Sequence, residues 1–248
     1  MKVGLNMNPK TNVVNLNNLR TTLKTYRTEE LCLPLDLPEE DLHCLGSIVK
    51  KHYLLQPGEH LYNIGDPGKA IYAVRSGTIK TYIPTNEGDE QVLGFYLPRE
   101  LLGFEAFSHD NFSSAAVAVE TSDVCELPFE SLEKLYNEVK GLREQIDRLI
   151  GREFYNDHTM LLLLGKRHGE QRLASFLLSI SRRLQNRGFS PKEFNLTMSR
   201  RDIGNYLGLA EETISRLFTR FQEEGIVRVE RKHLTIQDMD RLHTLIEH

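Results

Sequence analysis

The chain has 248 residues, of which 40% are apolar and 27% are charged, and its formal net charge is −4. This length allows one large domain or two ordinary ones, and the composition is that of a globular protein. No stretch of about 18 uncharged apolar residues is present, which excludes a membrane-spanning helix. The first residues lack the apolar core of a secretory signal. We therefore expect a cytoplasmic protein.

Charge is shared unevenly along the chain. Residues 1–169 carry 18 Lys and Arg against 24 Asp and Glu, whereas residues 170–248 carry 13 against 11. The acidic total therefore hides a nearly neutral C-terminal part, in which any basic surface must be local. The three cysteines, Cys32, Cys44 and Cys125, do not form the pattern of a disulfide framework. Reduced thiols are the expected state.

The N-terminal quarter of the chain contains two segments that differ in composition. Residues 1–27 are rich in Asn and Thr and predict a loose arm. Residues 38–51 begin with proline and acids, end with lysines, and place Leu42, Leu45 and Ile48 at helical spacing. This second segment predicts a short helix.

Residues 53–129 predict many short strands. Segments such as "AIYAVRSGTIKTYI", "EQVLGFYL" and "AAVAVETSDVCELPF" are rich in β-branched and aromatic residues and show frequent alternation. Between them lie turn-forming clusters, among them "GDPGK", "TNEGDE" and "SHDNFSS". This pattern predicts an antiparallel barrel or jelly roll, whose interior suits a small ligand. Together with the helices that follow, it gives an α+β fold.

Helical periodicity dominates from about residue 130 to 187. Six positions repeat at intervals of four, four, three, four and three residues, which is the spacing of a coiled-coil seam. These seam residues are Ile146, Ile150, Phe154, Asp157, Leu161 and Leu164. The seam predicts a homodimer, and the alternative is one buried helix in a monomer. Leu149, Leu162 and Leu163 lie off the seam and are expected to pack on the chain's own roll.

Asp157 is an acid in an otherwise apolar row. Across a two-fold axis its carboxylate would face its own copy, and two unit charges about 4 Å apart repel by roughly 4 kcal/mol at an effective dielectric constant near 20. Alternatively, Asp157 lies at the edge of the seam, solvated or paired with Arg152 of the partner chain. Both arrangements remain open at this point.

Residues 196–238 predict a winged helix-turn-helix. Ser199 precedes Asp202 by three residues, as in the capping box that begins many helices. "LGLA" supplies a turn with a glycine, Gly225 ends a second helix, and "IVRVERKHLTI" alternates as a β-hairpin with a basic tip. The apolar stripes of the two helices are Ile203, Tyr206 and Leu207, then Ile214, Leu217, Phe218 and Phe221.

In this fold the second helix enters the major groove with its N-terminus first. If the apolar stripe faces inward, Glu212, Ser215 and Arg216 lie on the opposite face. Glu accepts a hydrogen bond from cytosine N4, and Arg donates two to guanine O6 and N7. The remaining candidates are expected to contact phosphates; they are Ser199, Arg200, Arg201 and Arg220. The alternative for Glu212 and Arg216 is a solvated ion pair worth a few tenths of a kcal/mol.

The segments "IYAVRSGTIKTY", "GDEQVLGFYL", "VCELPFE" and "RGFSPKEFNLTMSRRDIGNYLGLAEETISRLFTRFQ" resemble the CRP/FNR superfamily of dimeric bacterial transcription regulators, most closely its FNR branch. The resemblance implies a cyclic-nucleotide-binding-like roll that acts as sensor, a dimerisation helix and a DNA-binding winged helix. The corresponding boundaries are 1–27 for the arm, 28–137 for the roll, 138–168 for the dimerisation helix and 169–248 for the DNA-binding domain.

The FNR-type pattern E-x-x-S-R matches Glu212, Ser215 and Arg216, whereas the arginine that precedes the glutamate in CRP-type members is replaced by Glu211. The resemblance thus implies an FNR-like palindrome, TTGAT-N4-ATCAA. It also implies an activating contact with RNA polymerase by the loop that contains Asn86, Glu87, Gly88 and Asp89. A solvated hairpin loop is the alternative for that segment.

The chain departs from the family at the residues that hold its two ligands, the [4Fe–4S] cluster and cAMP. Cys32 and Cys125 match two ligands of the FNR [4Fe–4S] cluster, but Leu23 and Tyr26 stand at the other two places and cannot supply thiolates. For cAMP, Gly103 and Glu105 are present, but Ser113 and Ser114 replace the Arg-Ser pair that binds the phosphate. We therefore expect neither cofactor.

Without a cluster, three explanations remain for how a chain with Asp157 dimerises and senses a signal. The apolar seam or a palindromic site holds a weakened dimer, which we favour; or Cys32 and Cys125 act as redox thiols, although inert thiols are more usual; or an unknown ligand binds the roll. The rival class of function is a ligand-binding module that controls a partner protein. The sequence has no nucleophile–base set, P-loop or metal motif, so we do not expect an enzyme.

Overall fold

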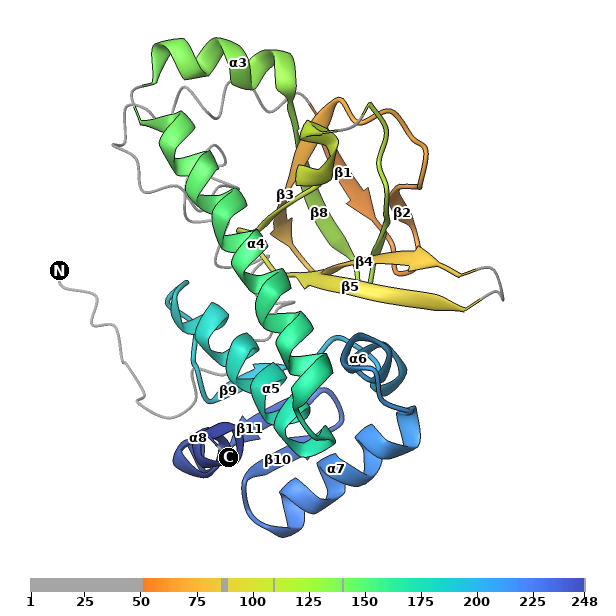
Figure 1. Ribbon diagram of the computed structural model, residues 1–248, viewed down its shortest axis with the longest axis vertical. Coiled ribbons are helices and arrows are strands. Elements are labelled where there is room, and N and C mark those ends of the chain that lie inside the picture. Colours follow the sequence, from red (N-terminus) through yellow and green to blue (C-terminus); the bar gives the residue numbers. More distant parts are fainter. Residues whose placement is uncertain (1–50, 86–88, 109, 140, 248) are drawn as a thin grey trace, which may run out of the picture.

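The computed structural model describes residues 51–85, 89–108, 110–139 and 141–247. Within these ranges the chain forms a β-roll, a long helix beside it, and a helical domain with a small sheet at the far end of that helix (Figure 1). The predicted arm and most of the predicted helix at 38–51 lie outside the described residues. Lys51, the last residue of that predicted helix, begins a strand instead.

The β-roll consists of two four-stranded sheets in the orders β1-β8-β3-β6 and β2-β7-β4-β5, with antiparallel pairing throughout. The strands and the short 3-10 helix η2 are β1 (Lys51–Leu55), β2 (His60–Tyr62), β3 (Ala70–Ser76), β4 (Ile79–Pro84), β5 (Glu90–Tyr96), β6 (Leu101–Leu102), η2 (Phe104–Phe107), β7 (Ala115–Ala118) and β8 (Ser122–Pro128). The predicted jelly roll is confirmed.

Aromatic side chains fill the interior of the roll. The rings of Tyr62 and Phe112 stack with centroids 3.8 Å apart, and the ring of Tyr72 lies 5.6 Å from Tyr62 and 6.1 Å from Phe112. All three side chains are buried in one apolar cluster. Burial raises the pKa of Tyr72 to about 12, with Glu126 adding to the shift, so the ring carries a neutral hydroxyl.

Two helices join the roll to the C-terminal domain. They are α3 (Phe129–Glu138) and α4 (Leu142–Lys166). The first part of α4 packs on the roll, since Leu142 and Ile146 are buried in the same cluster as Leu127 and Leu135. Further along α4, Glu153 accepts a hydrogen bond from the Tyr96 hydroxyl of β5 at 2.8 Å. The helix therefore lies along the roll before it reaches the C-terminal domain (Figure 1).

The C-terminal domain has a three-stranded sheet in the order β10-β11-β9 and four helices. Its elements are α5 (Gly169–Gln185), β9 (Glu193–Asn195), α6 (Arg200–Leu207), α7 (Glu211–Glu223), β10 (Val227–Glu230), β11 (His233–Ile236) and α8 (Met239–Glu247). The sequence reasoning missed β9 and α8. A signal for α8 is present, because Leu242, Leu245 and Ile246 have helical spacing and pack on the domain core.

The predicted helix-turn-helix is formed by α6 and α7. Ser199 caps α6 by accepting from Asp202 N at 3.0 Å, which confirms the predicted capping box. Gly208 ends α6 in the left-handed conformation, with φ of 61°. Gly204 of α6 packs against the turn and against α7, because a Cβ there would lie 2.6 Å from the Leu209 carbonyl oxygen of the turn and 3.4 Å from Ile214 Cγ1 of α7. This glycine therefore sets the distance between the two helices.

Substitution of Gly204 by alanine is expected to destabilise the fold by about 1–3 kcal/mol, because the added methyl group forces the backbone of the turn to move. Urea unfolding measures the effect. Gly169→Ala is the matched control, since its Cβ would meet side chains at ordinary distances of 3.5 Å or more. Equal stability of the Gly204→Ala and wild-type chains would contradict the close crossing.

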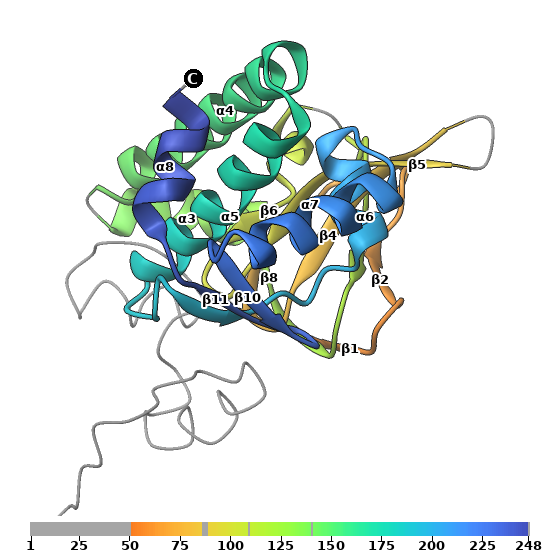
Figure 2. The same cartoon turned by 90° about the horizontal axis from the view of Figure 1, so that it is seen from below.

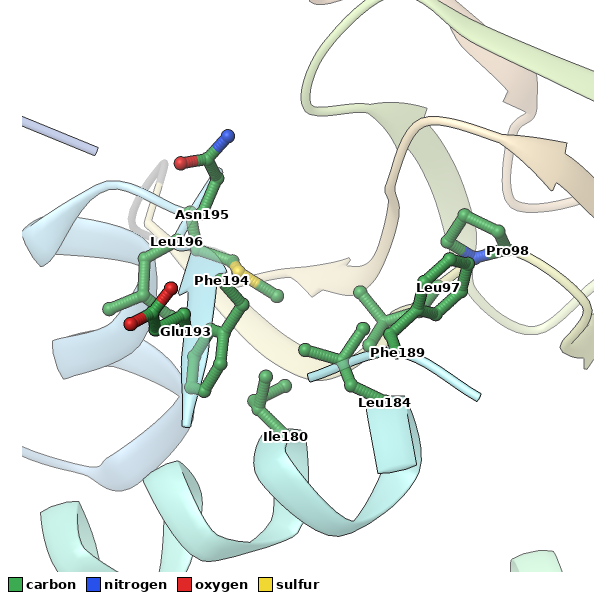
Figure 3. Close-up of a pocket in the computed structure, with 10 residues that line it drawn as sticks. Leu97, Pro98, Ile180, Leu184, Phe189, Glu193, Phe194, Asn195 and Leu196 are labelled. Atoms are coloured by element: carbon green, nitrogen blue, oxygen red, sulfur yellow. The ribbon is translucent and has the colours of Figure 1, made fainter. Parts of the chain in front are cut away.

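The two domains also meet at α5. Glu100, between β5 and β6, accepts a hydrogen bond from Arg183 Nε at 2.8 Å and forms ion pairs with Arg183 and Arg187. Beside these charges lies a small apolar cleft between Leu97 and Pro98 of the roll and the side chains of α5 and β9 (Figure 3). Its volume of about 20 Å³ holds about one water molecule. The cleft is therefore a packing seam between domains and not a ligand site.

Glu100→Gln is expected to destabilise the protein by about 3 kcal/mol at neutral pH, because it leaves two half-buried guanidinium groups without a counter-charge. Burial alone would raise the pKa of Glu100, but Arg183 and Arg187 hold it below its usual value. The stabilisation is therefore present above the pKa of the unfolded chain and is lost as the pH falls through the lower folded pKa. Urea unfolding of both chains from neutral to acidic pH should show the difference shrinking. The ion pair would be contradicted if the difference in unfolding free energy between wild type and Glu100→Gln did not change with pH. It would also be contradicted if that difference were no larger than the one caused by the exposed control Glu133→Gln.

Candidate nucleic-acid interface

The second helix of the helix-turn-helix, α7, is strongly amphipathic. Its residues Ile214, Phe218 and Phe221 are buried in the domain core. Because α-helical residues three and four apart share a face, this burial turns Glu212, Ser215 and Arg216 to the opposite side, and all three are exposed. The structure thus brings the three predicted base-reading residues together on one solvent-facing surface.

Arg216 and Glu212 do not form an ion pair with each other in the described structure. The Arg216 guanidinium instead donates to Thr213 Oγ1 at 3.3 Å, a neutral and readily replaced partner. The alternative of a surface ion pair within the helix therefore has no support here. The carboxylate of Glu212 and the guanidinium of Arg216 both face solvent on the same turn of helix.

The predicted phosphate-binding residues have different surroundings. Arg201 is exposed at the rim of an open groove that also contains Asn205 and Glu211. The Arg200 guanidinium lies over the Phe218 ring, 3.4 Å from its centroid, and burial lowers its pKa. Arg220 pairs with Glu224 at 2.7 Å and also with Glu170. Arg200 and Arg220 therefore hold α6, α7 and α5 together, whereas Arg201 points outward.

The predicted wing is the hairpin of β10 and β11, paired from Val227–Ile236 to Glu230–His233. Its two-residue turn consists of Arg231, in the left-handed conformation with φ of 58°, and Lys232, and both are exposed. The hairpin packs beside α7 (Figure 2). Two helices crossing at a glycine turn, a polar outer face on the second and a basic hairpin beside it define a winged helix-turn-helix DNA-binding domain.

The part of α4 beyond the roll exposes apolar side chains. Ile150 is 37% exposed, Phe154 62% and Leu161 68%, and Asp157 lies exposed between them. Ile146 differs from the other seam residues, because it is buried in the chain's own roll. Leu164 is half-buried. The middle of the predicted seam is thus an unpaired apolar surface of the single chain.

The off-seam leucines are only partly as expected. Leu149 packs on the roll cluster and Leu163 on the C-terminal core. Leu162, however, is 67% exposed, as is its neighbour Tyr155 at 66%. The expectation that Leu162 packs on the chain's own roll is wrong, because α4 has already left the roll at that level. The exposed apolar face is therefore wider than the predicted seam.

Of the two cysteines at the predicted cluster positions, the structure describes one. Cys32 lies outside the described residues. Cys125 is buried on β8, 3.6 Å from His52 Nδ1, and is disulfide-bonded, so the expectation of a reduced thiol is wrong for this residue. Proximity in the fold, and not sequence spacing, decides such pairing. Among the described residues, no cluster of three or more His, Cys, Asp and Glu side chains is arranged to hold a metal.

In the roll, Gly103 begins η2 in the left-handed conformation, and Glu105 accepts a hydrogen bond from Ser114 Oγ at 2.6 Å. Ser113 is exposed beside it. A serine hydroxyl engaged by a carboxylate offers no cation for a phosphate, and the Tyr62–Phe112 stack occupies the neighbouring interior. These residues do not fit a cyclic nucleotide.

Comparison with known proteins agrees with the geometry. A model of the Crp-like helix-turn-helix domain matches residues 171–245, and a model of the cyclic nucleotide-binding domain matches residues 54–139. The Fumarate and nitrate reduction regulatory protein of Escherichia coli (strain K12) is 48% identical over 219 residues, which is 88% of each chain. The Fumarate nitrate reduction regulatory protein of Klebsiella oxytoca is 49% identical over 216 residues, 87% of this chain and 86% of the relative.

The solved structure of FixK2 from Bradyrhizobium japonicum superposes with a TM-score of 0.72 at 30% identity, covering 79% of this chain and 96% of that one. The chain therefore belongs to the CRP/FNR family and is an FNR-like, DNA-binding transcription regulator. It is not an enzyme. None of the helices in the described part of the chain combines the length and hydropathy needed to cross a bilayer.

Proposed function

We propose that this regulator binds an FNR-like palindrome, TTGAT-N4-ATCAA, as a homodimer. The observation that carries the proposal is the exposed triplet Glu212, Ser215 and Arg216 on the outer face of α7. In the major groove, the Arg216 guanidinium matches guanine O6 and N7, and the Glu212 carboxylate matches cytosine N4. Ser215 is small enough for the helix to approach the bases closely. Ser199 and Arg201, at the start of α6, lie where phosphate contacts would fix the register.

A palindrome requires two symmetric recognition helices, about one helical turn of DNA apart. The exposed apolar face of α4 supports a second copy of the chain as the partner, because Phe154 and Leu161 are more than 60% exposed and lie on one side of the helix. This apolar face contains the exposed residues of the predicted dimer seam. Asp157 lies within it, so the dimer would bury two like charges near its axis.

We propose that the regulator needs neither a conventional [4Fe–4S] cluster nor cAMP. Four thiolates or a histidine substitute are required for the cluster, and only Cys32 and Cys125 stand at the family's ligand positions. The aromatic filling of the roll and the Glu105–Ser114 hydrogen bond support the same conclusion for cAMP. The apolar face of α4 and the palindromic site would then hold a weakened dimer together.

Activation would use the tip of the β4–β5 hairpin, Asn86, Glu87, Gly88 and Asp89, as the contact with RNA polymerase. Of these residues, only Asp89 is described, and it is exposed immediately before β5. As a regulator of transcription, the protein would work in the bacterial cytoplasm, where the chromosome is. The rival function, control of a partner protein through the helical tail, would leave the outer face of α7 without a purpose.

Arg216→Ala is expected to weaken binding to the TTGAT operator by about 1–3 kcal/mol and to relax the preference at its G·C pair, because the bidentate contact is lost. Gel-shift titrations against the operator, a G·C-substituted operator and random duplex measure both effects. Arg182→Ala, which removes an exposed charge from α5, is the matched control. Equal affinity of the wild-type protein for random and TTGAT duplexes would remove the basis of the proposal.

Asp157→Ala is expected to tighten self-association by about 1–4 kcal/mol at neutral pH, the range of like-charge repulsion between water and a protein surface. Although Asp157 is exposed in the single chain, nearby protein atoms partly desolvate its carboxylate and raise its pKa, with His158 opposing the shift. Wild-type association should therefore strengthen as the pH falls through this raised pKa, whereas that of the alanine variant should not. Sedimentation velocity measures both.

Asp157→Asn is the isosteric control and should behave as the alanine variant does. Unchanged association in both variants would show that Asp157 lies at the solvated edge of the dimer. A wild-type protein that stays monomeric on its operator until iron and sulfide are supplied would refute the cofactor-free dimer.

A further inference from the structure

A buried lysine joins the roll to the helix-turn-helix. Lys80 of β4 places its Nζ 2.9 Å from Asp202 Oδ1 on α6 and 2.6 Å from Glu90 Oε1 on β5. The Lys80 side chain is only 11% exposed and that of Asp202 18%. Burial alone would lower the pKa of Lys80, but Glu90 and Asp202 raise it above its usual value. The ammonium group thus stays charged between two carboxylates from two domains.

An amide side chain makes a second connection close by. Asn205 of α6 accepts a hydrogen bond from Val92 N at 2.6 Å through its Oδ1 and donates through its Nδ2 to the carbonyl of Glu90. Gln91 Nε2 returns a bond to the Asn205 carbonyl at 3.2 Å. Since β5 is the edge strand of its sheet, Asn205 occupies backbone groups that a further strand would otherwise bind.

Aromatic packing supports the polar contacts. Phe95 of β5 meets Tyr206 of α6 edge to face at 5.4 Å, and both rings contact Phe176 of α5. Val92 and Phe95 belong to the same apolar core as α5, α6 and α7. Figures 1 and 2 both show α6 beside the β4–β5 hairpin. The first helix of the helix-turn-helix is thus held on the roll by charge, amide and apolar contacts together.

These contacts meet the part of α6 that bears on DNA. Asp202, the partner of Lys80, also accepts a hydrogen bond from Ser199 Oγ at 2.6 Å in the capping box. Ser199 and Arg201 are the proposed phosphate-contacting residues at this helix start. A change in the position of the roll edge would therefore move the start of α6, and with it α7.

We propose that Lys80 and Asn205 are positioning residues that fix each helix-turn-helix on its own β5, and so set the distance between the two recognition helices of the dimer. The proposal rests on the proposed binding to a palindrome. A dimer whose DNA-binding domains are held rigidly discriminates between operators by their spacer length, because the wrong spacer strains the contact between the roll and α6. A dimer whose DNA-binding domains are loosely tethered tolerates several spacer lengths but loses the binding affinity that preorganisation provides.

The test compares operators with three-, four- and five-base-pair spacers and a single half-site. Lys80→Met, Asn205→Ala and the double variant are titrated against each by gel shift at fixed salt. We expect affinity for the four-base-pair operator to fall about tenfold, the loss expected for about 1.4 kcal/mol of preorganisation. The preference over the other spacers should shrink, and half-site affinity should stay at the wild-type value. Lys80→Arg, which keeps the charge, should restore the preference.

Lys134→Met and Asn137→Ala, both at exposed positions of α3 and away from the contact between the roll and α6, are the matched controls. An equal loss on every duplex, half-site included, would show a role in folding only, and unchanged spacer preference would refute the positioning role. A wild-type protein without any preference for TTGAT over random duplex would instead refute the proposed function itself. The two failures are therefore distinguishable.

Discussion

The burial of one side of α7 determines what this protein can present to DNA. Three apolar side chains of α7 are almost completely buried, namely Ile214, Phe218 and Phe221. Exposing any one of them to water would cost on the order of 1.5–3 kcal/mol of folding free energy. Rotation of α7 about its axis is therefore fixed by the core. Glu212, Ser215 and Arg216 are exposed for that reason alone, and this exposure supports our proposal that Glu212 accepts a hydrogen bond from a base edge.

The four arginines of α6 and α7 divide into two that pack against other helices and two that point to solvent. Arg200 contacts the Phe218 ring and Arg220 pairs with Glu170 and Glu224, so these two arginines contribute to the packing of the helices. Arg216 and Arg201 lie outward with weak partners or none in the described structure. This division explains how a chain with an acidic total charge presents a local surface suited to nucleic acid.

The sequence predicted the elements whose signals are local. The capping box at Ser199 and Asp202, the stripe of α7 and the basic hairpin tip depend on a few neighbouring residues, and all are present. Contacts between distant segments were not predictable: Lys80 and Asp202 are 122 positions apart, and nothing in either segment indicates the other. The exposure of Leu162 depends likewise on where α4 leaves the roll. The strand β9 was not predicted, because its three residues are too few to show the alternation of apolar and polar side chains that indicates a strand.

The most direct test of the account is the structure of the protein on a TTGAT-N4-ATCAA duplex. The account predicts two copies of the chain, with each Arg216 guanidinium within hydrogen-bond distance of a guanine O6 and N7 and each Glu212 carboxylate facing the same groove. A complex in which the outer face of α7 turns away from the bases would contradict it.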